Sequence, residues 1–109
     1  MPIDEDSQKR RAYFPRGLFQ PEGSFRFSAD ALLLAAFVMR HCLPRPPGTL
    51  SLLDIGCGCG VVSLACLLAG EGLSARGVDR VPELADAASR NARALGLEER
   101  FSAAALDVT

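Results

Sequence analysis

The chain has 109 residues, of which 49% are hydrophobic and 23% are charged. This size allows one small domain, and this composition supports a buried core and excludes a disordered polymer. Twelve basic and thirteen acidic side chains give a formal net charge of −1, so strong non-specific binding of nucleic acid by the whole chain is not expected.

The sequence shows neither a signal peptide nor a membrane span. A signal peptide begins with a basic region that is followed by an apolar region. Residues 1–6 contain neither. The longest apolar run, residues 31–39, has nine residues, whereas a membrane-spanning helix needs about 20. We therefore expect a cytoplasmic protein without membrane contact. The four cysteines should stay reduced there, and no second pair completes a zinc spacing with Cys57 and Cys59, so no metal is expected.

The first two parts of the chain precede the predicted sheet. Residues 1–27 are predicted to form an irregular arm, because prolines and glycines interrupt them. In residues 28–49, Ser28 can cap a helix. That helix is apolar nearly all round, so we expect it to be packed. The Pro-rich residues 44–48 end the helix and form a linker.

Residues 50–109 form the third part, in which predicted strands and helices alternate. Strands are expected at residues 50–55, 74–79 and 101–106, and helices at 61–69 and 82–95. The first strand is a short apolar run, which is typical of a strand buried in a parallel sheet. Pro82 and Gly96 bracket the second of these helices. The alternation predicts an α/β fold with a parallel sheet and crossover helices, one half of a Rossmann-like domain.

A glycine-rich loop follows the first predicted strand. Residues 54–60 read Asp-Ile-Gly-Cys-Gly-Cys-Gly, and glycines let the backbone turn tightly and approach a ligand. A dinucleotide fingerprint needs glycine where Val61 stands, and a phosphate loop needs a lysine that is absent here. Because Asp54 before the loop would repel a pyrophosphate, it favours a cationic ligand such as S-adenosylmethionine (SAM), whose ammonium group it can bind.

Two further acids follow the other predicted strands. Asp79 can accept hydrogen bonds from both ribose hydroxyls, as acids in NAD-binding enzymes also do. Asp107 can accept one from an adenine amine. The carboxyl ends of parallel strands share one edge of the sheet, where open α/β sheets bind ligands. Asp54, Asp79 and Asp107 are therefore expected to form a nucleoside-binding edge.

These residues carry a resemblance to a known family. Residues 54–60, with Gly77-Val-Asp79 and Leu106-Asp107, resemble class I SAM-dependent methyltransferases, over about residues 50–109. Residues 18–35 resemble the opening segment of small-domain methyltransferases, and this resemblance implies that Phe27, Ser28 and Asp30 lie over the SAM pocket. The nearest subgroup is the tRNA(Val) adenine methyltransferases, which modify an exocyclic amine in the anticodon loop. The resemblance implies a Rossmann-like methyltransferase fold, SAM as cofactor and tRNA as partner. The expected cofactor-binding residues are Asp30, Asp54, Gly56, Cys57, Gly58, Gly60, Asp79, Arg80 and Asp107.

Three residues also have structural interpretations that need no cofactor. Asp30 is also explained as a first-turn acid of its helix, and Arg80 as a surface arginine. Asn91 matches an asparagine usual in such helices, and we expect it to bond to a neighbouring loop as a structural residue.

One motif of the resembled family is missing. Its amine methyltransferases carry Asn/Asp-Pro-Pro-Tyr/Phe after a fourth strand, whereas Pro46-Pro47 precedes the first strand here and has neither a flanking acceptor nor an aromatic residue. We therefore predict that the chain holds only the first three strands of the fold, as a truncated or amino-terminal fragment would. It is expected to contain no catalytic residue and to be inactive alone. An exposed sheet edge would favour self-association.

Several alternatives remain open. The methyl acceptor could be a base of ribosomal RNA or a protein glutamine, the chain could bind SAM without catalysis, or it could be a nicotinamide-binding half. The arm also has two interpretations. Five of the seven aromatic residues lie within fifteen positions beside basic residues, a mixture that can bind RNA. We favour the other interpretation, in which the phenylalanines pack on the sheet and the charges are solvated.

Overall fold

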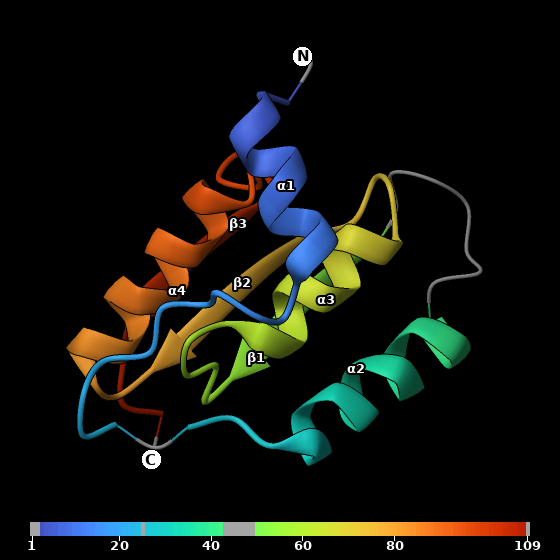
Figure 1. Cartoon of the computed structure of the whole chain (residues 1–109). Helices are drawn as coiled ribbons and strands as arrows, with labels where there is room; N and C mark the ends of the chain where they lie inside the picture. The colour runs from blue at the N-terminus through green and yellow to red at the C-terminus, as the bar shows by residue number, and fades with distance from the viewer. Residues whose placement is uncertain (1–2, 25, 43–49, 109) are drawn as a thin grey trace.

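The computed structural model describes residues 3–24, 26–42 and 50–108. Its elements in chain order are α1 (Glu5–Tyr13), α2 (Ala29–Cys42), β1 (Ser51–Ile55), α3 (Val61–Ala69), β2 (Ser74–Asp79), α4 (Pro82–Ala94) and β3 (Phe101–Ala105). The strands pair in parallel in the order β1-β2-β3 (Figure 1). The expected α/β fold with a parallel sheet is confirmed.

The elements after residue 50 lie close to their predicted positions. α3 and β2 have the predicted bounds, and β1, α4 and β3 differ from prediction by one residue at one end. β1 pairs with β2 from Ser51 opposite Ser74 to Ile55 opposite Val78, and Asp79 of β2 lies opposite Ala105 of β3. This register brings the carboxyl ends of all three strands to one edge of the sheet.

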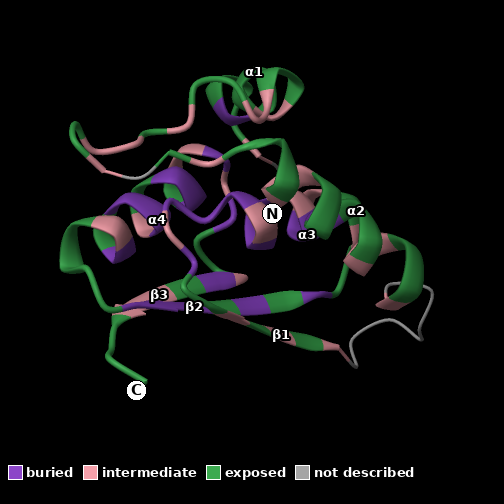
Figure 2. Ribbon diagram, turned by 90° about the horizontal axis from the view of Figure 1, so that it is seen from below, coloured by how far each residue is buried: buried purple, intermediate pink, exposed green. Residues whose placement is uncertain are grey.

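The labelled helices lie on one side of the sheet (Figure 2). The core between helices and sheet contains Leu64 and Leu67 of α3, Ala88 of α4 and Phe101 of β3. The sheet approaches the loop after β1 closely. A Cβ atom on Gly77 would lie 2.8 Å from Cys57 Sγ and 3.2 Å from Phe101 Cζ, so this position of β2 requires glycine.

The opposite side of the sheet is not covered by any described helix, and this corrects two predictions. β1 is not a buried strand, because Leu53 and Ile55 face the uncovered side and each is 61% exposed. The helix of the second part, α2, is not packed all round. It packs against α3 through Ala35, the one buried residue among those described in it, and it leaves Leu33, Leu34 and Phe37 exposed.

The arm also differs from its prediction, because residues 5–13 are helical. Asp4 caps α1 by accepting a hydrogen bond of 2.7 Å from the Ser7 amide. Glu5 and Asp6 stand in the first turn and Arg10 and Arg11 in the last, which suits the helix dipole. Residues 14–24 and 26–28 are irregular. The predicted linker at residues 44–48 lies outside the described residues.

α1 is fixed to the carboxyl end of α4 by one arginine. Arg11 Nε donates to the carbonyl of Leu95 at 2.7 Å, and its Nη2 donates to that of Gly96 at 3.3 Å. These carbonyls have no partner within their own helix. Among the described helices, none is long and apolar enough to cross a membrane.

Candidate functional site

A cavity of about 350 Å³ lies between the glycine loop after β1 and the beginning of α2. Its volume is in the range of about 300–1,000 Å³ that is common for small-molecule sites. The predicted site residues that line it are Asp30, Asp54, Gly56, Cys57 and Gly58. We call this space the glycine-loop cavity. It lies at the carboxyl end of β1, where open α/β sheets bind ligands.

The glycine loop is fastened to β2 and α4. The amides of Gly56 and Cys57 both donate to the carbonyl of Val78, at 2.8 and 3.0 Å. Gly60 begins α3 with a φ of 93°, a left-handed conformation that favours glycine. A Cβ atom there would lie 3.2 Å from Ala88 Cβ of α4. Gly60 therefore lies on the side of the loop that faces α4, and it does not line the cavity.

Asp54 is a partly buried carboxylate at the cavity wall. One of its oxygens accepts a hydrogen bond of 2.7 Å from the Ser63 hydroxyl. Burial raises the pKa of Asp54 above its usual value; the Ser63 hydrogen bonds oppose this shift, and the negative charge of Asp79 adds to it. A cationic ligand in the cavity would oppose this shift, because an opposite charge nearby favours the ionised carboxylate.

Asp79 is buried behind the loop and is not among the residues that line the cavity. Its two carboxylate oxygens accept hydrogen bonds from the amides of Gly58, at 2.9 Å, and Val81, at 3.0 Å. A carboxylate has about four lone-pair positions, so two remain for further donors. Asp79 thus joins the glycine loop to the turn before α4.

Arg80 and Asp107 are not brought into the cavity. Arg80 is exposed in the turn after β2, and Asp107 is exposed two residues beyond the end of β3. Neither lines the glycine-loop cavity. The cavity thus combines β1, its loop and α2, whereas the nucleoside edge predicted from the sequence used the ends of all three strands.

The cysteines of this region are thiols rather than thiolates. Burial raises the pKa of Cys57 to about 12 and that of Cys66 to about 11, and it also raises the pKa of Cys59. They are therefore protonated at neutral pH and serve as small packing residues. Within the described part of the chain, no three histidine, cysteine or acidic side chains gather as a metal site requires.

Asn91 of α4 joins the arm to the glycine loop, as its prediction required. It is 3% exposed. Its amide nitrogen donates to the carbonyls of Phe19, at 2.9 Å, and Cys59, at 3.0 Å, and its oxygen accepts from the Phe19 amide at 2.7 Å. The same side chain therefore fixes a segment of the arm and one side of the loop.

One side chain near the site was not anticipated from the sequence. Ser63 lies in the first turn of α3, nine positions after Asp54, and only the fold shows that its hydroxyl reaches that carboxylate. Its signal in the sequence was weak, because a serine in an apolar segment has many structural roles. Phe27 and Ser28, which the resemblance of residues 18–35 placed over the cofactor pocket, do line the cavity, and the Phe27 amide donates to Gln20 Oε1 at 3.2 Å.

No protein-family model matches the chain, and no curated protein matches it. Solved structures do. The C-terminal domain of precorrin-6Y C5,15-methyltransferase from Rhodobacter capsulatus is 28% identical, with a TM-score of 0.64 over 86% of this chain and 47% of that chain. A geranyl diphosphate methyltransferase in complex with GPP and sinefungin is 26% identical, with a TM-score of 0.58 over 67% of this chain and 26% of that chain.

An O-methyltransferase from Bacillus cereus in complex with SAH shares the fold at 18% identity, with a TM-score of 0.56 over 95% of this chain and 44% of that chain. The chain therefore spans less than half the length of each of these three proteins. Over most of its length it is structurally similar to class I SAM-dependent methyltransferases.

Proposed function

We propose that this chain binds SAM in the glycine-loop cavity and is the cofactor-binding part of a methyltransferase that acts on an exocyclic adenine amine of tRNA. The observation that carries the proposal is the charge of the cavity. Two carboxylates, Asp30 and Asp54, line it together with backbone-accessible glycines. Burial raises the pKa of the Asp54 carboxyl, and a cation in the cavity would favour its ionised form.

The chemistry of SAM fits these residues. SAM carries an ammonium and a sulfonium group and no phosphate, so the two carboxylates would attract it and would repel a dinucleotide. Asp54, which lines the cavity, would accept a hydrogen bond from the ammonium. Asp79, which does not line it, would hold the loop through the Gly58 amide. When bound, SAM supplies an electrophilic methyl group. The chain's own contribution is to bind and orient it.

Titration calorimetry of the full chain tests the cofactor. We expect SAM to bind and NADH not to bind. Asp54→Asn keeps the size of the side chain and removes its charge. A charge-assisted hydrogen bond contributes about 1.5–3 kcal/mol, so the variant should lose about tenfold or more in SAM affinity.

Glu71→Gln is the matched control, because Glu71 is exposed beyond α3 and far from the cavity lining. It should bind SAM as the unchanged chain does. Binding of NADH, or an equal SAM affinity in Asp54→Asn, would contradict the proposal.

The methyl acceptor requires a separate measurement. The proposal of a tRNA adenine rests on the resemblance of residues 18–35 and on the basic arm beside the cavity. Cells in which the coding sequence is disrupted should lose one N6-methylated adenosine from tRNA, as measured by mass spectrometry of digested nucleosides. Loss of a methylated base from ribosomal RNA, or of methylglutamine from a protein, would instead identify one of the alternative acceptors.

A further inference from the structure

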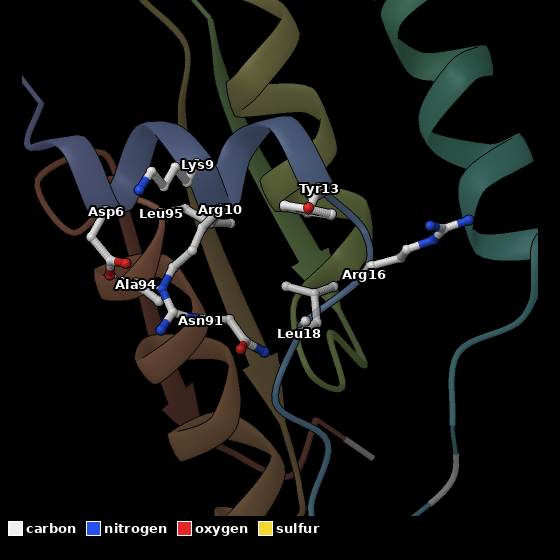
Figure 3. A pocket seen from close by; sticks show the side chains of 10 residues that line it. Asp6, Lys9, Arg10, Tyr13, Arg16, Leu18, Asn91, Ala94 and Leu95 are labelled. Carbon is white, nitrogen blue, oxygen red and sulfur yellow. Dashed lines mark hydrogen bonds and ion pairs between the residues drawn. The ribbon is translucent and has the colours of Figure 1, made fainter.

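A groove separate from the glycine-loop cavity lies where α1 crosses α4 (Figure 3). The part beside Lys9 and Tyr13 has a volume of about 300 Å³, and the adjoining part beside Phe19 and Gln20 has a volume of about 510 Å³. Six residues line both parts, namely Asp6, Arg10, Gly17, Leu18, Asn91 and Ala94. We call them together the α1–α4 groove.

The α1–α4 groove is strongly basic. Five of its lining side chains are cationic and one is acidic, and the cations are Lys9, Arg10, Arg16, Arg26 and Arg90. The acid, Asp6, is already paired with Arg10 at 3.0 Å. In the part of the chain that the structure describes, no carboxylate pairs with Lys9, Arg16 or Arg26. Since the whole chain has a net charge of −1, this concentration of positive charge is local.

Two aromatic rings stand among these cations. Tyr13 is 66% exposed and Phe19 is 37% exposed, although the interpretation favoured from the sequence packed the arm's phenylalanines, Phe19 among them, on the sheet. Phe14 and Phe27 do pack against the core. The Arg90 guanidinium lies 3.9 Å from the centre of the Phe19 ring, a cation–π contact that keeps a flat surface at the groove. Exposed aromatic and guanidinium planes are the surfaces on which unpaired bases stack.

The α1–α4 groove is connected to the glycine-loop cavity through hydrogen bonds. Asn91, which lines the groove, bonds to Phe19 on one side and to Cys59 of the glycine loop on the other. Gln20, from the outer part of the groove, accepts from the amide of Phe27, which lines the cavity. A ligand held in the groove would therefore contact the segment of the arm, residues 19–27, that also borders the cavity.

We propose that the α1–α4 groove binds single-stranded RNA, with its cations on the phosphates and Tyr13 and Phe19 against the bases. The choice of RNA rests on the proposed function, because a methyltransferase for a loop adenine must hold the unpaired nucleotides beside it. A negatively charged protein surface would use the cations but leave the two aromatic planes without a stacking partner.

Fluorescence anisotropy with the full chain tests the proposal. The probe is a labelled single-stranded RNA of about twelve nucleotides, within the range of about 4–16 that one small binding fold covers. Lys9→Glu with Arg16→Glu should weaken binding at least tenfold. The double variant should also show a weaker dependence of RNA affinity on salt, because each phosphate contact contributes about −0.7 to the slope of log K against log salt.

The matched control is Arg40→Glu with Arg76→Glu. It changes the net charge equally at two exposed positions outside the groove and should keep most of the affinity. Tyr13→Ala should lose about tenfold, and Tyr13→Phe should retain binding, because stacking needs only the ring. Equal losses in both double variants, or no effect of Tyr13→Ala, would overturn the proposal.

Two further binding measurements identify the ligand. A duplex of the same RNA should bind more weakly, because its bases are not available for stacking, and inorganic phosphate at millimolar concentration should not displace the single strand. Equal affinity for the duplex, or displacement by phosphate, would overturn the assignment to single-stranded RNA.

SAM binding by the Lys9→Glu, Arg16→Glu variant separates this proposal from the proposed function. We expect it to be unchanged. RNA binding that depends on the groove, in a chain that does not bind SAM, would uphold the groove and reject the cofactor site. SAM binding without RNA binding would do the reverse.

Discussion

The charge of Asp54 depends on the hydroxyl of Ser63. Burial raises the pKa of Asp54, and the hydrogen bond from Ser63 is the largest influence that lowers it. Protonation of Asp54 removes the negative charge that we propose attracts the ammonium of SAM. The affinity for SAM should therefore fall as the pH decreases, and it should begin to fall at a higher pH than an exposed aspartate with a pKa of 3.8 would cause.

Ser63→Ala should move this pH dependence further. Without the hydroxyl, the pKa of Asp54 rises again, so SAM affinity should fall at a higher pH than in the unchanged chain, while the two affinities converge in alkaline solution. The measurement is the dissociation constant of SAM across a pH series. Ser102→Ala, at an exposed position of β3, is the control. Superimposable pH profiles for all three chains would show that Ser63 does not influence the site.

For individual residues, the sequence predicted which ones line the cavity better than it predicted how they are arranged. Asp54 and the glycines could be assigned because a carboxylate before a glycine loop has few other roles. For Arg80 and Asp107, closeness to a strand end could not show whether the side chain lines the cavity. Such a position does not determine which way the chain turns after the strand. Ser63 was missed for the same reason, because its partner is set by the packing of α3 against β1.

β2 passes so close to the glycine loop at Gly77 that it leaves no room for a side chain there. Gly77→Ala would place a methyl group within 3 Å of Cys57. Overpacking of this kind costs about 1–3 kcal/mol, so the free energy of unfolding, measured by urea denaturation, should fall by about that amount.

Arg76→Ala is the matched control for Gly77→Ala. It introduces the same residue one position earlier in β2, where the exposed side chain faces the uncovered side of the sheet, and it should change the free energy of unfolding by less than about 0.5 kcal/mol. Equal stability of the unchanged chain and Gly77→Ala would mean that the loop can shift without cost.

Among the elements, those with a hydrophobic pattern were predicted and the one without it was not. The strands and helices from residue 51 onward alternate between apolar runs and turn residues, which is the strongest signal a sequence offers. In α1 only Ser7 is buried, so no apolar stripe marks it. Its signal was the cap at Asp4 with acids first and bases last. The prediction of an irregular arm rested on the prolines and glycines that follow this segment.

One side of the sheet is left uncovered by the described helices. Leu53 and Ile55 of β1 lie on it, and β1 is also an edge strand among the strands that the structure describes. Such edges pair readily with other chains unless charged residues protect them. We therefore predict that the chain associates with itself through β1, and sedimentation equilibrium should show a mass that rises with concentration.

Leu53→Lys should reduce this association, because a charge on an edge strand opposes pairing. Ala12→Lys adds the same side chain on α1, on the far side of the molecule (Figure 2), and should leave association unchanged. A single monomeric mass at every concentration would contradict the prediction.

The three hydrogen bonds of Asn91 have a thermodynamic consequence. Because one buried amide holds both the arm and the glycine loop, we expect the two segments to open together as one local unfolding unit. A ligand that stabilises the loop then stabilises the arm. Linkage is reciprocal. Whatever factor a ligand in the cavity applies to binding in the groove, a ligand in the groove applies to binding in the cavity by the same factor.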